Sequence, residues 1–281
     1  MIPVAQIKKD LSYSRDLTDT IDVLKLMATS EFGNLSSRKP KRDMLKERII
    51  ECFGLLRAIS ETNPFFIEQK GIPKGYLMIC SDEGFLGEVN ALVVGAAMKR
   101  GLEEKAKFAV LGEKGKKILS ETGVEFDSFP GIENDIDMKE IIKISDYIMD
   151  LYKKKKISAM YVSYMKFGSF TSHHLDVAKL LPCGELIDYI KETGKKDSET
   201  LIEPNPYYVL EYLVKLWIEC NMHDIFWSSK LSEWSVRAMH LEQSSDELKK
   251  VNRDLRFKYF KSVHALNDKV IREIFAARAS G

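Results

Sequence analysis

The sequence has few of the features that mark disulfide-rich, zinc-binding or membrane-spanning proteins. Its cysteines are far apart and form no C-x-x-C pair: Cys52, Cys80, Cys183 and Cys220. We therefore expect reduced and mostly buried thiols rather than disulfides or a zinc site. The longest mostly apolar run covers residues 91–98, far short of the ~20 residues that span a bilayer. The N-terminal residues lack the layout of a signal peptide, so we expect no membrane insertion.

The charge balance and the missing catalytic motifs exclude further classes. Lys plus Arg number 43 and Asp plus Glu 42, without the basic excess that is typical of nucleic-acid binding. The sequence contains no H-E-x-x-H or G-x-S-x-G motif. His173 and His174 are adjacent, and neighbouring side chains face different ways, which suits two metal ligands poorly. We predict no catalytic, cofactor-binding or metal-binding residues.

One segment has the position of a phosphate-binding loop but not its sequence. Ser81–Gly87 reads SDEGFLG and lies between an expected strand and an expected helix. Two glycines at such a turn could present backbone amides to a phosphate. The segment matches neither G-x-G-x-x-G nor G-K-[ST], so we favour a tight turn. A Rossmann-like nucleotide-binding enzyme is kept as the less favoured alternative.

The last section of the chain has the most regular pattern. After Pro206 there is neither proline nor glycine as far as Arg278, and apolar residues recur at threes and fours between Trp234 and Ile274. A helix of about 70 residues would be roughly 100 Å long. No globular domain of this size buries such a helix throughout, so its apolar seam needs a partner. We consider one interruption, near Asn221–Asp224.

The N-terminal section supplies a partner for that seam. Apolar residues recur at helical spacing between Val4 and Ile59, and Gly33 and Pro40 interrupt the pattern. Because proline lacks an amide hydrogen and clashes with the preceding turn, we expect a break within Ser36–Pro40. The two terminal helices should pair in antiparallel orientation.

Short apolar runs alternate with helical patterns in the middle of the chain. This alternation predicts a mainly parallel sheet with helices on its faces. The polar segment Lys191–Thr200 should be a surface loop. The expected strands are Gly75–Cys80, Phe108–Leu111 and Ser158–Tyr164, and the expected helices between them are Val89–Arg100, Lys114–Glu121 and Met138–Tyr152. The predicted organisation is an N-terminal helix in residues 1–62, an α/β domain in 72–200 and a C-terminal helix in 205–281.

Five segments resemble, in order, the motifs of one known family. The turn at 77–90, LMICSDEGFLGEVN, resembles S-D-x-G-x-x-G-x-x-N, and VLGEKGKK at 110–117 resembles a G-x-K-G segment. The stretch at 162–182, VSYMKFGSFTSHHLDVAKLLP, resembles Y-N-K-F ending in L-L-P. LIEPNP at 201–206 resembles F-E-P-S-P, and EWSVRAMHLEQSSD at 233–246 resembles E-x-x-x-R-M-x-A-M-x-x-A-T-D. The family is the gamma subunit of F-type ATP synthases.

The resemblance implies an α/β fold in which a long antiparallel coiled coil of the N- and C-terminal helices carries an inserted Rossmann-like α/β domain. It implies a non-catalytic rotor shaft that couples rotation of the membrane ion-translocating ring to ATP synthesis or hydrolysis. Catalysis then lies on the beta subunits. The implied partners are the alpha, beta and epsilon subunits and the membrane c-ring, without nucleic acid or cofactor. The implied location is peripheral, at the cytoplasmic face of the inner membrane.

The resemblance also suggests which side chains couple the shaft to its partners. Arg237 would carry a fixed charge able to bind carboxylates. For Met27, packing in the apolar seam is an equally good interpretation. We predict partner-contact or coupling roles, from matching positions in the helical motifs, for Lys25, Met27, Arg237, Glu242, Gln243 and Ser245.

Three segments depart from the family pattern. Lys25–Gly33 reads KLMATSEFG and is less basic than the family's K-M-V-A-A-x-K-L-R-like stretch. Val263–Asp268 stands where the family has an R-Q pair, and Glu83 stands at the arginine of S-D-R-G. Fewer charge-assisted contacts imply weaker and less salt-sensitive association with an acidic loop of beta. The alternative interpretation is therefore a rotor subunit of a specialised F-type-like ATPase that is not used for ATP synthesis.

Overall fold

The computed structural model describes residues 3–38, 43–56, 63–184, 186 and 202–279. The chain divides into two compact units, one of Met1–Ser30 with Arg237–Gly281 and the other of Glu31–Val236. Helices α1 (Val4–Ser37) and α8 (Pro206–Ala279) contribute residues to both units. The predicted loop Lys191–Thr200 lies outside the described residues. Within the described part of the chain, every helix is too short or too polar to span a bilayer.

The larger unit is built on a five-stranded sheet with the strand order β3-β2-β1-β4-β5. The first four strands pair in parallel, and β5 pairs antiparallel with β4. The mainly parallel sheet expected from the sequence is therefore confirmed, while β3 and β5 were not expected. The strands are β1 (Gly75–Ile79), β2 (Lys107–Leu111), β3 (Phe126–Phe129), β4 (Met160–Ser169) and β5 (Ser172–Leu181).

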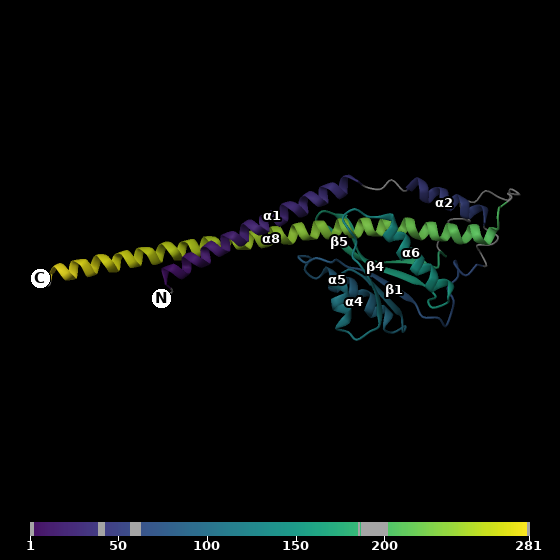
Figure 1. Cartoon of the computed structure of the whole chain (residues 1–281), viewed down its shortest axis with the longest axis horizontal. Coiled ribbons are helices and arrows are strands. Elements are labelled where there is room, and N and C mark those ends of the chain that lie inside the picture. The colour runs from purple at the N-terminus through teal and green to yellow at the C-terminus, as the bar shows by residue number, and fades with distance from the viewer. Residues whose placement is uncertain (1–2, 39–42, 57–62, 185, 187–201, 280–281) are drawn as a thin grey trace. The chain divides into compact units, whose positions relative to one another are not determined.

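The central strand β1 divides the apolar side chains of the larger unit into two cores. Because successive strand residues point to opposite faces, Tyr76 and Met78 lie in one core and Leu77 and Ile79 in the other. Figure 1 shows α4 and α5 beside one face of the sheet, with α6 and α8 beside the opposite face. These helices are α4 (Val89–Gly101), α5 (Glu113–Ser120) and α6 (Met138–Lys153).

Helix α2 (Asp43–Leu55) extends the core that α6 and α8 cover. Ile49 and Phe53 are buried there, and the ring of Phe53 lies edge-on to Phe66 with centroids 5.7 Å apart. Helix α1 ends at Ser37 and the next described helix begins at Asp43. The N-terminal section is thus interrupted where the proline pattern predicted it.

The smaller unit pairs the first 30 residues with the C-terminal part of α8. Ser245 contacts Asp22 and Asn252 contacts Thr18, so residue numbers rise on one helix as they fall on the other. This is the expected antiparallel pairing. Helix α8 is continuous over 74 residues, so the break considered near Asn221–Asp224 is absent. The side chain of Asn221 donates to the carbonyl of Trp217 one turn earlier, which leaves the helix unbroken.

Candidate functional site

Three of the predicted coupling residues meet in a polar layer between the paired helices. The ammonium of Lys25 lies 2.8 Å from Glu242 Oε2 and 3.4 Å from Asp22 Oδ1. The hydroxyl of Ser245 donates to Asp22 Oδ1 at 2.7 Å. Ser245 itself is fully buried. Because the Lys25–Glu242 and Ser245–Asp22 contacts both cross the helix pair, the layer fixes the register of the two helices.

The polar layer shifts the titration of its charged groups. The hydrogen bond from Ser245 holds the pKa of Asp22 below its ordinary value, and the ammonium groups of Lys249 and Lys25 add to this effect. The hydrogen bond to Glu242 raises the pKa of Lys25, and the charges of Glu242 and Asp22 contribute further. Both groups therefore stay charged over the physiological pH range, which keeps the layer intact.

A second polar layer lies one to two turns away along the helices, at Thr18 and Asn252. The amide of Asn252 donates to Thr18 Oγ1 at 2.9 Å, and the Thr18 hydroxyl donates to the carbonyl of Ser14 at 2.8 Å. Thr18 is buried, as is Ile21 on the same helix. The sequence analysis missed Asp22, Thr18 and Asn252. Their partners are on the other helix, and helical spacing alone does not give the register between helices.

The other predicted residues do not join this layer. Met27 is 58% exposed, so the structure places it outside the apolar seam, and Gln243 is also exposed. Arg237 is 4% exposed, and a partner carboxylate would reach it only if surrounding side chains moved. Met27 and Gln243 therefore offer side chains to a partner, whereas Arg237 belongs to the interior.

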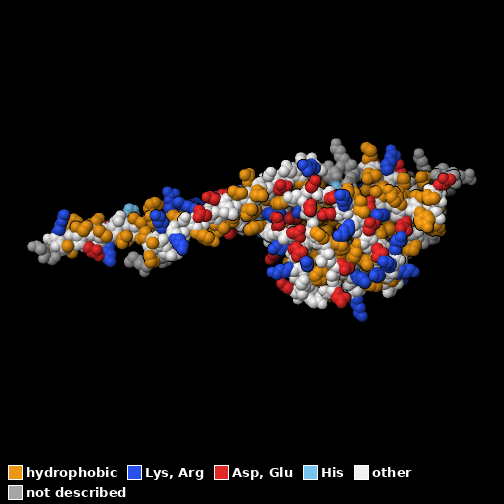
Figure 2. All heavy atoms as spheres, viewed as in Figure 1, with side chains coloured by type: hydrophobic (Ala, Val, Ile, Leu, Met, Phe, Trp, Pro, Cys, Tyr) orange, Lys and Arg blue, Asp and Glu red, His pale blue; other side chains and the backbone are white. Residues whose placement is uncertain are grey.

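The end of α8 carries apolar side chains with no cover from within the described chain. Every described residue from His264 to Arg278 is exposed. Figure 2 shows apolar side chains along this part of α8, interspersed with Lys and Arg. The predicted seam thus extends further than its pairing with α1. Large apolar side chains that are about half exposed or more include Phe257, Phe260, Leu266, Val270, Ile271, Ile274 and Phe275.

The glycine-containing turn after β1 is organised by its own carboxylate. Asp82 Oδ1 accepts a hydrogen bond from the backbone amide of Glu113, at the start of α5, at 2.9 Å. The same carboxylate lies against Gly131, where an added Cβ would stand 2.3 Å from Asp82 Oδ2. A helix N-terminus of this kind is where a phosphate would bind. The aspartate thus occupies the N-terminus of α5, whereas the Ser81–Gly87 turn leads into α4. In that turn the Ser81 hydroxyl donates to the carbonyl of Glu83 and the Ser81 amide donates to Asn90 Oδ1, which fits a tight turn.

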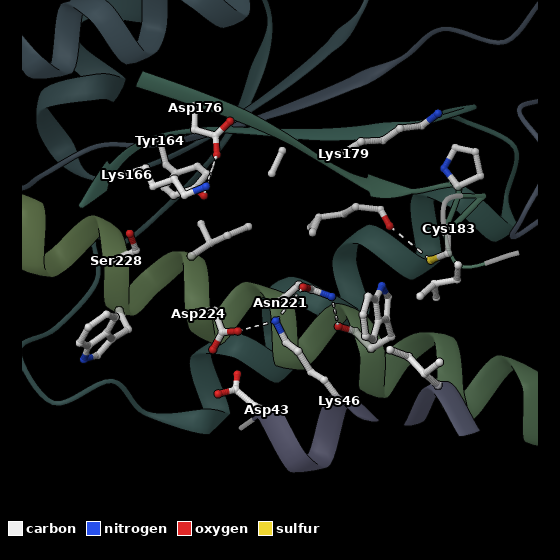
Figure 3. A pocket seen from close by; sticks show the side chains of 18 residues that line it. Asp43, Lys46, Tyr164, Lys166, Asp176, Lys179, Cys183, Asn221, Asp224 and Ser228 are labelled. Carbon is white, nitrogen blue, oxygen red and sulfur yellow. Dashed lines mark hydrogen bonds and ion pairs between the residues drawn. The ribbon is translucent and has the colours of Figure 1, made fainter. Parts of the chain in front are cut away.

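A pocket of the larger unit lies between α2, α8 and the β4–β5 hairpin, and has a volume of about 600 Å³. Figure 3 shows Lys46 reaching toward Asp224 and Asn221 on α8, and Lys166 beside Asp176 on the strands. Lys179 has Glu68 as its partner at 3.4 Å. Since each of these lysines has an acidic partner, the pocket has no excess charge to attract an anion.

The adjacent histidines alternate across strand β5. His173 is half-buried, which lowers its pKa, and His174 is exposed on the other face. No group of His, Cys, Asp or Glu suited to a metal ion occurs among the residues that the structure describes.

Known proteins resemble the chain over nearly its whole length. A family model described as ATP synthase matches residues 4–277. The ATP synthase gamma chain of Clostridium acetobutylicum is 26% identical over 257 residues, which cover 87% of each chain. The ATP synthase gamma chain of Histophilus somni is 24% identical over 295 residues and covers 100% of each chain.

Solved structures share the fold. A chain of the Euglena gracilis mitochondrial ATP synthase, in a structure of OSCP, F1 and c-ring, matches with a TM-score of 0.72 and 12% identity, covering 99% of this chain and 94% of that one. A chain of the central stalk and c-ring of the Tetrahymena thermophila mitochondrial ATP synthase matches with a TM-score of 0.63 and 18% identity. That match covers 80% of this chain and 99% of the other. Similarity at these identities concerns the fold.

Proposed function

Because this chain belongs to the ATP synthase gamma-chain family, we propose that it is the rotor shaft that couples rotation of a membrane ion-translocating ring to ATP synthesis or hydrolysis. One observation carries the proposal: an antiparallel helix pair held in register by polar layers, whose longer helix continues with uncovered apolar side chains. A shaft needs a fixed register so that both helices turn together. It also needs an outer surface that partner subunits can contact.

The catalytic work falls to the partners. In this proposal, beta subunits bind and convert the nucleotide, and rotation of the asymmetric shaft biases each of them among conformations of different nucleotide affinity. The shaft then contributes contacts and no nucleophile. The Ser81–Gly87 turn supports this assignment, since it matches neither G-x-G-x-x-G nor G-K-[ST].

The partners follow from the family. The uncovered end of α8 would lie within the ring of alpha and beta subunits, where apolar side chains lose contact with water. The α/β domain would contact the epsilon subunit and the c-ring. The complex would then hold this chain at the cytoplasmic face of the membrane as a peripheral subunit.

Coupling residues are proposed at the exposed positions of the helix pair. Met27 and Gln243 would touch the alpha–beta ring directly, while Lys25, Glu242 and Ser245 hold the two helices in the register that presents them. Arg237 would act from the interior by keeping α8 in place.

The coupling assignment is tested with Met27→Ala and Gln243→Ala in the assembled complex. Truncation of an interface contact worth about 1 kcal/mol should slow ATP hydrolysis about fivefold. Lys99→Ala on α4 is the matched exposed control and should leave turnover unchanged. Unchanged turnover and coupling in both variants would remove Met27 and Gln243 from the site.

The function itself is tested by purifying the native complex through a tag on this chain and identifying its subunits. Alpha and beta subunits together with a membrane ring are expected. A divergent ring would favour the specialised ATPase, which the less basic Lys25–Gly33 segment suggests. Purification without alpha or beta subunits, combined with micromolar nucleotide binding that Gly84 and Gly87 substitutions abolish, would instead favour the nucleotide-binding enzyme.

A further inference from the structure

The tip of the β4–β5 hairpin holds the end of helix α1 through aromatic rings. The ring of Phe32 on α1 lies edge-on to Phe170, with centroids 5.0 Å apart and an interplanar angle of 82°. It also lies 5.8 Å from the ring of Phe167 at an angle of 50°. Edge-to-face arrangements of this kind are favoured by the ring quadrupoles. One phenylalanine of α1 is therefore held by two from the sheet.

Helix α8 hydrogen-bonds to both the hairpin and α1. The hydroxyl of Ser228 accepts a hydrogen bond from the backbone amide of Phe167 at 3.0 Å. The neighbouring indole of Trp227 donates to the carbonyl of Leu35, in the last turn of α1, at 3.3 Å. The hairpin, α1 and α8 are thus joined pairwise. We call Phe32, Phe167, Phe170, Trp227 and Ser228 the hairpin clasp.

A pocket and an irregular strand pairing lie next to the hairpin clasp. Next to it lies the pocket of about 600 Å³, which is lined by Tyr164 and Lys166 of the hairpin and by Asp224 of α8 (Figure 3). Side chains that face a hollow lose packing contacts on that side. The strand pairing is also irregular between Phe167 and Ser169, and such irregularities re-aim side chains at a strand end. The rings of Phe167 and Phe170 at the hairpin tip are thus the aromatic contacts of the sheet with α1 among the described residues.

We propose that the hairpin clasp transmits torque between the α/β domain and helix α1. Both helices run from the smaller unit into the larger one, but α8 covers residues 206–236 there, whereas α1 ends at Ser37. A helix pair resists twisting only when both helices are held at the same end. The clasp holds α1 there, next to α8, so that both turn with the sheet. This inference rests on the proposed rotor function.

The test measures coupling in the assembled complex carrying Phe32→Ala. Losing the aromatic contacts should raise the population with an open clasp about tenfold, the factor that corresponds to about 1.4 kcal/mol. ATP hydrolysis should continue, and the ion transport driven per ATP should fall. Phe32→Leu should restore part of the transport. Phe129→Ala is the matched control, because Phe129 pairs edge-on with Tyr147 at 5.0 Å, away from α1.

A cross-link decides the case even if Phe32→Ala fails to assemble. Phe32→Cys and Phe170→Cys, combined with Cys52→Ser to remove an exposed thiol, are joined with a short thiol-reactive linker. Transport per ATP should be low before linking and recover after it, because the bond replaces the aromatic contact. Equal coupling in wild type, Phe32→Ala and both cross-linking states would overturn the clasp. A wild-type complex without alpha and beta subunits would instead overturn the rotor function.

Discussion

At the residue scale, Asp22 makes the most contacts of the described residues in the polar layer. It accepts from Ser245, faces the ammonium of Lys25 and lies 4.0 Å from Lys249. Because the hydrogen bond from Ser245 is the largest cause of its lowered pKa, Ser245→Ala should raise the pKa of Asp22 toward its ordinary value. Lys249→Ala should raise it less. Carbon-13 NMR titration of the carboxyl group measures both, and the reverse order would contradict this assignment.

The same shift predicts the behaviour of the helix pair in acid. A carboxyl group whose folded-state pKa is depressed stabilises the fold above its unfolded-state pKa, near 4. That contribution disappears as the pH falls through the folded-state pKa. The wild-type helix pair should therefore loosen in acid, while Ser245→Ala should show a smaller pH dependence. Hydrogen exchange of backbone amides in 14–25 and 241–252 follows the change.

Sequence reasoning reached part of this layer. Lys25, Glu242 and Ser245 were chosen because they match helical motifs, and the structure brings them together. Asp22 was missed, although its spacing of three from Lys25 was visible. A contact across two helices depends on their relative register, which two separate periodic patterns leave undetermined.

At the element scale, the start of α5 depends on one glycine. Gly112 has a φ of 92°, and a Cβ there would lie 2.3 Å from the carbonyl oxygen of Cys80. Both the conformation and the contact exclude a side chain. Gly112→Ala should lower the free energy of unfolding by more than about 1 kcal/mol, measured by urea denaturation.

A second glycine gives the opposite expectation and serves as the control. Gly95 is exposed on α4, and a Cβ there would meet nothing within 4 Å. Gly95→Ala should raise the free energy of unfolding by about 0.5–1 kcal/mol, because alanine loses less backbone entropy in a helix. Equal effects of the two substitutions would show that the backbone at Gly112 is not constrained.

The unexpected strands have physical explanations. β3 (FDSF) and β5 (SHHLDVAKLL) lie at the two edges of the sheet, where burial is partial and no apolar run results. The buried strands β1 and β2 gave continuous apolar runs and were found. In helix α8 the opposite occurred: a break was considered near Asn221, but the helix is continuous there. The side chain of Asn221 donates to the carbonyl of Trp217 one turn earlier and accepts from Lys46 of α2.

At the scale of the whole molecule, the order of motifs was more informative than any single motif. Each segment, such as LIEPNP at 201–206, is too short to identify a family alone. Their order constrained the paired terminal helices and the inserted α/β domain together, and the match over residues 4–277 agrees with that assignment. The side chains that contact partners could not be predicted in this way, because contact with a partner produces no periodic pattern in the sequence.

From the uncovered end of α8 we predict how the chain behaves when it is isolated from its partners. Phe257 and Phe275 are separated by about five helical turns and so face the same side of the helix, with 71% and 66% of each exposed. Exposed apolar surface of this extent favours association. The isolated chain should therefore self-associate and bind a hydrophobic dye, and Phe257→Ser with Phe275→Ser should reduce both.

Light scattering and dye fluorescence provide the measurement, with Phe85→Ser as the control. Phe85 is 56% exposed, but it lies in the turn after β1 and not on this helix. Within the assembled complex the same end of α8 should be protected, because an alpha–beta ring would cover it. Dye binding should then be lost on assembly. If the isolated wild-type chain stayed monomeric and bound no dye, the apolar side chains would not need a partner, and this argument for a surrounding ring would fail.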